Sequence, residues 1–295
     1  MSFNKKRLKV TLYLGEKGKS FDDNGKNTVV LENFRVSAMV QSGNGSGASP
    51  TAKIMIWGLG KNIINQVTKI HWNTEQSQLN SIKLEADNGD GVYYVVYQGT
   101  ISFAYPNFGS APEHILTIDS VTALNHQVLP TQPTSHNGSA DVADMIKTLC
   151  DSMGMKFENN GVNIKLSNPY LPQTALEKVR QICESANISM YLDKDTIAIA
   201  LKDQPRKTKI AVLSPNTGLI GYPVPNLQGI TLKALYDQSV IFGGLIEIKD
   251  SQIEMANGQW RVFGITYYLE SELPSGRWEM EIQAASPTGG ARIAK

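Results

Sequence analysis

The chain has 295 residues, more than one hydrophobic core usually organises, so its length predicts two or three domains. Its content of 41% hydrophobic and 19% charged residues is typical of a folded protein and excludes wholesale disorder. Because 28 basic residues face 27 acidic ones, the net charge of +1 excludes recruitment of nucleic acid by bulk charge.

The sequence gives no sign of a membrane span or an export signal. No stretch approaches the roughly 20 consecutive apolar residues of a membrane-spanning helix. The first seven residues are basic, but residues 8–14 alternate apolar and polar where a signal peptide needs a continuous apolar run. The two cysteines, Cys150 and Cys183, form neither a disulfide framework nor a Cys-x-x-Cys site. We therefore expect a first strand at residues 8–14 and assembly in a reducing cytoplasm.

Residues 1–128 show the pattern of an antiparallel β domain. From residue 8 to about 122, apolar residues recur at every second position, as in Ala52, Ile54 and Ile56. Turn-forming segments rich in glycine separate these runs at residues 22–25, 42–47 and 88–91. The pattern predicts a barrel or a sandwich. Residues 60–69 interrupt it with the spacing of a short helix, which we expect to close one end of the barrel.

A linker is predicted at residues 129–138, which hold two prolines and hardly any apolar side chain. Beyond it, residues 139–204 contain two helical patterns. The first is expected to be capped by Ser139 and to end at Gly154. The second opens on Thr174 and Glu177, the pair of a capping box, and is expected to end at Asn187 in the left-handed conformation.

Each predicted helix is followed by two alternating runs around a polar turn, at residues 155–166 and again at 188–201. The sequence of helix, cap and hairpin recurs with a shift of 33 residues, and Cys150 and Cys183 occupy equivalent places in the two copies. Two copies are too few for a solenoid. The pattern therefore predicts one compact α+β domain in which two helices cover two hairpins.

The period of two returns after residue 207 and predicts a second antiparallel β domain over residues 205–285. Its glycines and prolines cluster between the alternating runs, as turns require. The last stretch, residues 286–295, is expected to be a flexible tail. The fold class that follows is mainly β, with two barrel-like domains flanking a helix-hairpin repeat domain.

The residues that carry chemistry in other proteins form no complete motif in this sequence. The four histidines are too far apart for a metal motif on one helix, and the glycine-rich loop at residues 43–47 lacks the lysine of a phosphate-binding loop. The acidic run at residues 85–90 lacks the ligand spacing of a calcium loop and fits a hairpin turn better. The basic group at residues 206–209 fits a solvated linker better than a phosphate site. We therefore expect no catalytic residue, no metal site and no cofactor, which favours a structural protein.

Several segments together resemble the central baseplate hub proteins of contractile phage tails, whose relatives form the base of type VI secretion spikes. The order of domains is similar, and so are turn and apolar patterns along most of the chain. These patterns lie at residues 56–59, 140–201, 217–223, 229–232, 242–247, 258–264 and 276–278. One departure is the lack of an appended lysozyme or needle domain.

The resemblance implies a structural role in the tail of a virion assembled in the bacterial cytoplasm. Three copies would form a homotrimeric ring in which the two β domains of each chain alternate. Such a ring would match the six-fold tail tube on one side and the three-fold central spike on the other, and DNA would pass through its lumen. Its partners would be the tube protein, the spike protein and other baseplate proteins.

Five residues are candidates for contacts between subunits of such a ring. They are Trp57, Leu219, Tyr222, Gly243 and Trp278. Each of the aromatic residues fits ordinary core packing equally well. Two other functions stay open at this point. One is a cell-wall hydrolase carried on the virion, which would need a concave acidic or metal site. The other is a carbohydrate-binding β protein, which would expose aromatic residues on one sheet.

Overall fold

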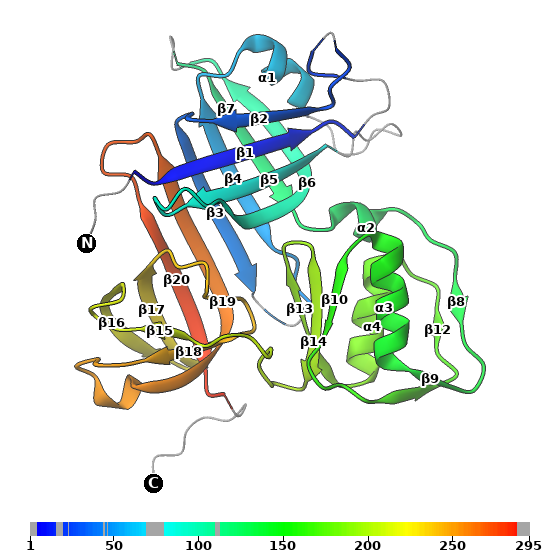
Figure 1. Ribbon diagram of the computed structural model, residues 1–295. Helices are drawn as coiled ribbons and strands as arrows, with labels where there is room; N and C mark the ends of the chain where they lie inside the picture. Colours follow the sequence, from blue (N-terminus) through cyan, green and yellow to red (C-terminus); the bar gives the residue numbers. More distant parts are fainter. Residues whose placement is uncertain are drawn as a thin grey trace. The chain divides into compact units, whose positions relative to one another are not determined.

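A computed structural model describes residues 5–15, 20–22, 24–43, 45, 47–68, 80–109 and 113–287 (Figure 1). The chain forms two compact units, and neither unit is one continuous segment. Unit 1 comprises Met1–Gln41, Pro50–Leu124 and Tyr267–Glu279, and unit 2 comprises Ser42–Ser49, Asn125–Thr266 and Met280–Lys295. Residues near the end of the chain thus contribute to unit 1, whereas the sequence suggested only consecutive domains. The boundaries at residues 128, 138, 204 and 285 remain a prediction.

Unit 1 is built on an antiparallel sheet with the strand order β19-β3-β4-β7-β6-β5-β1-β2. Its core consists of the apolar residues at alternate positions, among them Val10, Ile54 and Ile118, all of which are fully buried. The expected strand at residues 8–14 is therefore confirmed, shifted by one residue. The strands are β1 (Arg7–Tyr13), β2 (Thr28–Glu32), β3 (Val36–Gly43), β4 (Thr51–Trp57), β5 (Ser81–Asp87), β6 (Tyr94–Asn107), β7 (Ile115–Val121) and the end of β19 (Gly258–Ser271).

Of the two predicted forms, a barrel or a sandwich, the described strands of unit 1 form no closed barrel, because their order ends at β2 without returning to its start. The short helix expected near residues 60–69 is present as α1 (Lys61–Val67), and it buries Ile64 and Val67. The acidic segment at residues 85–90 lies at the β5–β6 turn, where the carboxylate of Asp87 accepts hydrogen bonds from the backbone of Gly89 and Gly91. This confirms the hairpin interpretation of that segment.

The first part of unit 2 is an α+β layer in which α3 and α4 lie side by side against a small sheet (Figure 1). That sheet has the order β10-β14-β13. The predicted linker is partly ordered, since β8 lies within it and pairs with β12. The elements are α2 (Leu124–Val128), β8 (Thr134–Ser135), β9 (Ser139–Asp141), α3 (Val142–Met153), β10 (Lys156–Asn159), β11 (Lys165–Ser167), β12 (Tyr170–Leu171), α4 (Ala175–Ser185), β13 (Ile188–Asp193) and β14 (Thr196–Leu201).

The caps of these helices agree with the sequence at their ends but not at their starts. Gly154 and Asn187 both adopt the left-handed conformation, as expected. Helix α3, however, is capped by Asp141, whose carboxylate accepts from the backbone of residues 143 and 144, and Ser139 lies in β9. The capping box of α4 does not form, because Thr174 makes no side-chain cap bond and Glu177 pairs with Arg180.

Only the second of the two predicted hairpins exists. Strands β13 and β14 pair antiparallel around the turn at residues 194–195. The strands of the first copy do not pair with each other, because β10 lies parallel to β14 and β11 pairs with β9. The helix-hairpin repeat is therefore broken in its first copy.

The second part of unit 2 is a sheet with the order β16-β17-β20-β19, in which β18 lies beside β19 and β15 beside β18. The β15–β18 pair is parallel, and this departs from the all-antiparallel expectation. The elements are β15 (Ala211–Leu213), β16 (Leu219–Asn226), β17 (Gly229–Leu235), β18 (Leu245–Ile248), the 3₁₀ turn η1 (Glu254–Ala256), β19 and β20 (Trp278–Ala285). Across the described residues, no helix is both long and apolar enough to cross a membrane.

Candidate assembly surfaces

The two predicted interface residues of unit 1 are held by contacts within the unit. Trp57 ends β4, and its ring lies 4.8 Å from the guanidinium carbon of Arg35. Trp278 is only 5% exposed, and its indole Nε1 donates to Asn88 Oδ1 at 2.6 Å. Internal packing thus accounts for the burial of Trp278, and a subunit contact at either tryptophan stays a prediction.

The three predicted residues of unit 2 lie in different surroundings. Leu219 is buried at the start of β16, whereas Tyr222 in the same strand is 53% exposed. Gly243 has a positive φ of 81°, and a Cβ atom there would lie 2.6 Å from the ring of Tyr191. The backbone conformation and the contact with Tyr191 therefore favour glycine at position 243 without any contact between subunits. Of the three, Tyr222 is the one with a large exposed side chain, and a subunit contact at any of them stays a prediction.

The first exposed apolar surface is the outer face of the sheet in unit 1. Four strands carry it, and the residues directly opposite one another across β3, β4, β7 and β6 form two rows. We call this set the outer face; its rows are Met39, Lys53, Asp119 and Phe103, and Ser37, Met55, Thr117 and Tyr105.

The outer face exists because side chains alternate between the two sides of a strand. The residues between the two rows, Ala38, Ile54, Ile118 and Ala104, are at most 3% exposed and form the core side. A register shift between Ile101 and Phe103 in β6 resets the alternation, so that an aromatic residue points outward at position 103. Three large apolar side chains of this face are exposed: Met39 by 41%, Phe103 by 39% and Tyr105 by 43%.

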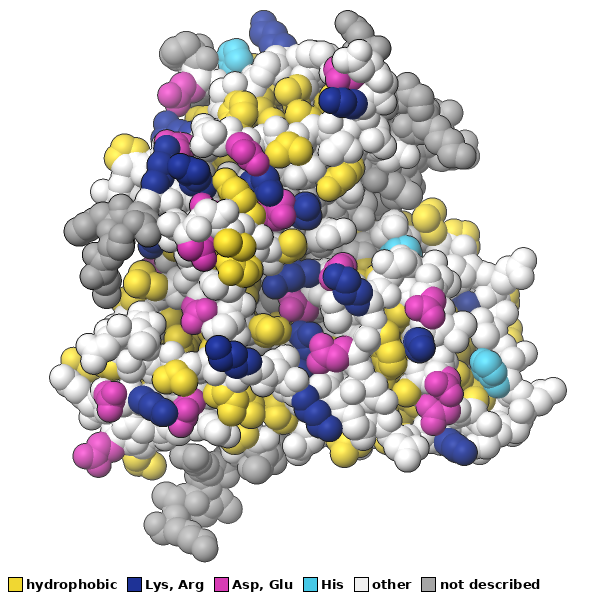
Figure 2. All heavy atoms as spheres, in the orientation of Figure 1, with side chains coloured by type: hydrophobic (Ala, Val, Ile, Leu, Met, Phe, Trp, Pro, Cys, Tyr) yellow, Lys and Arg dark blue, Asp and Glu magenta, His cyan; other side chains and the backbone are white. Residues whose placement is uncertain are grey.

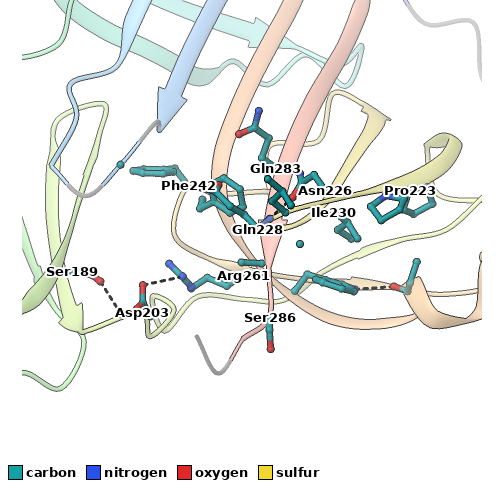
Figure 3. A pocket seen from close by; sticks show the side chains of 18 of the residues that line it. Ser189, Asp203, Pro223, Asn226, Gln228, Ile230, Phe242, Arg261, Gln283 and Ser286 are labelled. Atoms are coloured by element: carbon teal, nitrogen blue, oxygen red, sulfur yellow. Dashed lines mark hydrogen bonds and ion pairs between the residues drawn. The ribbon is translucent and has the colours of Figure 1, made fainter. Parts of the chain in front are cut away.

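The second surface is a groove in unit 2, about 1040 Å³ in volume (Figure 3). Segments far apart in the sequence line it: the loop before β17, the turn around η1, the middle of β19, the end of β20, and β13 with the residues after β14. Asn226, Gln228, Gln283 and Ser286 are among the polar residues that line it (Figure 3). We call this site the groove.

A buried cation lies at the wall of the groove. Arg261 of β19 is 8% exposed, and its guanidinium donates to Tyr191 Oη at 3.2 Å and to Asp203 Oδ1 at 3.3 Å. Asp203 is in turn positioned by Ser189, whose hydroxyl accepts its backbone N–H (Figure 3). The Nε of Arg261 is buried and has no acceptor among the residues the structure describes. An unsatisfied buried donor costs free energy that an incoming acceptor would recover.

The rim of the groove is apolar and strongly exposed. Leu227 at the tip of the β16–β17 hairpin is fully exposed, Met255 in η1 is 77% exposed and Ile253 is 41% exposed. Isolated exposed apolar residues are common, but several around one concave site mark an interaction surface. The sequence held one signal of it, the leucine within the Asn226–Gly229 turn, where polar residues are usual.

A second cavity of unit 2, about 650 Å³, lies between α3 and the segment that carries β8 and β9. The ammonium of Lys178, on a residue only 2% exposed, donates there to Gln132 O at 2.5 Å and to Thr134 Oγ1 at 3.2 Å. Burial lowers the pKa of Lys178. Lys178 of α4 thus holds the segment at residues 129–138, which the sequence predicted to be a linker, against the helix.

The charges of the chain are distributed rather than gathered into a site. Figure 2 shows basic and acidic side chains interspersed with hydrophobic ones on the face that is visible. Among the described residues, no three histidine, cysteine or acidic side chains come together as a metal site would require. Arg206, expected in a solvated linker, is instead 6% exposed, and it pairs with Glu158 at 2.7 Å and Asp193 at 3.4 Å.

Comparison with known structures identifies the class of protein to which this fold belongs. A 43 kDa tail protein of prophage MuSo2 from Shewanella oneidensis is similar over 95% of this chain and 98% of its own, with a TM-score of 0.60 and 10% identity. A tail protein from Neisseria meningitidis is similar over 95% of this chain and 99% of its own, with a TM-score of 0.59 and 11% identity. A component of the Escherichia coli type VI secretion system, the c3393 protein, covers 88% and 76%, with a TM-score of 0.60 and 12% identity. The fold is thus that of phage tail proteins and their secretion-system relatives.

The family is established by sequence. A family model described as "Baseplate hub gp41" matches residues 7–275, and the chain therefore belongs to this baseplate hub family. No curated protein matches the sequence. The resemblance noted in the sequence is confirmed, and the chain is a structural component of a phage tail baseplate.

Proposed function

We propose that three copies of this chain form a ring at the centre of the baseplate, which adapts the six-fold tail tube to the three-fold central spike. The observation that carries this proposal is the match to the baseplate hub family along nearly the whole chain. The likeness to the c3393 protein supports it, because that protein is described as structurally similar to the tail proteins gp27 and gp5 of phage T4.

The symmetry argument depends on the presence of two β parts in one chain. Three chains that each bring two β parts can present six units to a six-fold partner and still repeat only three times towards a three-fold one. Unit 1 and the second part of unit 2 each contain an extended sheet, which supplies these parts. The outer face and the groove lie on different parts of the chain, as a ring built from head-to-tail contacts requires.

The contacts of the ring are expected to be made by side chains more than by strand addition. Strand β16 lies at the edge of its sheet, but Pro223 and Pro225 remove two of its backbone donors. Prolines at an edge discourage pairing with another strand. The exposed Tyr222 and Val224 of the same strand remain available for apolar contact.

The partners in this proposal are the tube protein on one face of the ring, the spike protein on the other, and neighbouring baseplate proteins. DNA passes through the lumen without being bound, which agrees with the net charge of +1. The ring is assembled in the host cytoplasm and remains in the tail of the virion.

Size-exclusion chromatography coupled to light scattering tests the ring directly. The proposal predicts a particle of three chains, three times 32.3 kDa or about 97 kDa, with no turnover of any substrate. A stable particle of one chain at high protein concentration would contradict it. Mass photometry of the same sample, with and without a tube or spike protein, then measures binding of the partner.

A further inference from the structure

We propose that the groove of unit 2 receives the outer face of unit 1 from a second copy of this chain. This inference rests on the proposed ring and names the two surfaces that join in it. Each surface combines exposed apolar side chains with polar ones within its own unit, and each chain carries one of each kind.

The shapes and the apolar groups of the two surfaces are complementary. The groove is concave, and Leu227, Ile253 and Met255 surround it with exposed aliphatic and thioether side chains. The outer face offers two projecting rings, Phe103 and Tyr105, on the long strand β6. Aromatic anchors that enter a pocket lined by aliphatic side chains are the usual source of affinity at protein interfaces.

The charges are complementary as well. Arg261, Lys202 and Asp203 line the groove, and Arg261, although it is paired with Asp203, keeps its buried Nε without an acceptor among the described residues. The outer face carries the carboxylate of Asp119, which lies opposite Phe103 on one neighbouring strand and opposite Lys53 on the other. The aromatic ring of Phe103 and the carboxylate of Asp119 lie side by side. Such a pair suits a pocket that has apolar walls and a guanidinium, because an aromatic face and a carboxylate both attract a cation.

A head-to-tail contact between two different surfaces follows from the same observations. If the groove of one copy met the groove of another, two buried arginines would face each other. If two outer faces met, they would leave the Nε of Arg261 without an acceptor. A contact of groove with outer face avoids both, and repetition of such a contact around an axis closes a ring.

Site-specific cross-linking tests the contact in the assembled protein. A chain that carries Leu227→Cys and Tyr105→Cys is treated with a short bismaleimide and examined on a denaturing gel. Both changes lie on exposed side chains, and the two native cysteines are buried. We expect covalent dimers and trimers. The matched control carries Leu227→Cys with Val92→Cys, which is 48% exposed but outside both surfaces, and is expected to remain a single chain on the gel.

A second pair of variants tests the energy of the contact. Leu227→Asp places a charge at the rim without touching the core, and we expect it to shift the mass from three chains to one while the circular dichroism spectrum stays that of the folded chain. Val92→Asp should leave the trimer intact. Suppose that the wild type is a trimer but the chain with Leu227→Cys and Tyr105→Cys gives no cross-linked species, or that the Leu227→Asp variant remains a trimer. Either result overturns this inference and leaves the proposed ring standing. A wild-type monomer overturns both.

Discussion

Replacement of Gly243 by alanine separates a packing role of this residue from a role between subunits. Its φ of 81° is unfavourable for alanine, and the added Cβ would lie 2.6 Å from Cδ1 of Tyr191. The side chain of Tyr191 has little freedom to move, because it is only 3% exposed and its hydroxyl donates to Gln204 O at 2.7 Å. Its aromatic ring also lies edge-on to that of Phe242, with 5.5 Å between the two ring centroids.

The expected cost of Gly243→Ala is the sum of two effects. A non-glycine residue in the left-handed region costs about 1–2 kcal/mol, and overpacking of a filled core costs about 1–3 kcal/mol. We therefore expect the free energy of unfolding to fall by about 2–5 kcal/mol. For a unit of this size that corresponds to a decrease in melting temperature of roughly 5–15 °C.

Gly154→Ala is the matched control for the backbone effect alone. Gly154 also lies in unit 2 with a positive φ of 67°, but a Cβ there would meet nothing within 4 Å. Its substitution should cost about 1–2 kcal/mol. Both variants are compared with the wild type by thermal unfolding followed by circular dichroism. If Gly243→Ala melts at the same temperature as Gly154→Ala and loses only the assembled particle, the packing argument is refuted and Gly243 acts between subunits.

Three further predictions concern unit 2. Arg206→Gln should cost about 1–3 kcal/mol, because it leaves two partly buried carboxylates, those of Glu158 and Asp193, without their cation. Burial raises the pKa of Glu158, but the hydrogen bonds and charge of Arg206 outweigh this and hold the pKa below its usual value. A lowered carboxyl pKa stabilises the fold above about pH 5, and this stabilisation is lost on acidification. Urea titrations at several pH values should therefore show that the free energy of unfolding falls less with acidification in Arg206→Gln than in the wild type. Asp141→Ala should cost about 1 kcal/mol through the lost cap of α3, whereas Ser139→Ala should cost nearly nothing, and equal costs in chemical denaturation would contradict the observed cap. Burial raises the pKa of both cysteine thiols to about 12, so neither should react with a thiol reagent at pH 8 until the protein is unfolded; rapid reaction in the native state would show that the helices open.

The local patterns of the sequence were sufficient to predict where strands and helices occur. Alternation of apolar residues marked β1, β4 and β7, and glycine or asparagine marked the ends of α3 and α4. These patterns involve only residues within one helical turn or one strand, so they can be read without knowledge of the tertiary structure. The prediction of Ser139 as the cap was wrong, because Asp141 caps α3 and serine and aspartate cap helices about equally well.

Pairing between distant strands could not be predicted in the same way. The run at residues 155–166 has the alternation and the polar turn of a hairpin, yet β10 pairs with β14, about 40 residues later in the chain. The periodicity of apolar residues predicts which side of a strand is buried, but it does not predict with which other strand it pairs. The open sheet and the contribution of Tyr267–Glu279 to unit 1 depend on such distant pairing and were missed for the same reason.

The candidate surfaces were predicted only in part. Tyr222 was singled out by residue type and is exposed, but Trp278 and Gly243, chosen in the same way, have packing roles inside the chain. The groove itself is lined by residues between positions 45 and 286, so no continuous motif could reveal it. Residue type alone does not distinguish a buried anchor from an exposed one.

The central claim is that two β parts in one chain let three copies present six units around one axis. Electron microscopy of the purified assembly, viewed along its axis, tests this most directly. The account predicts a closed ring of three chains with six lobes around the lumen, two from each chain. A ring with three lobes, in which only one β part of each chain surrounds the lumen, would contradict it.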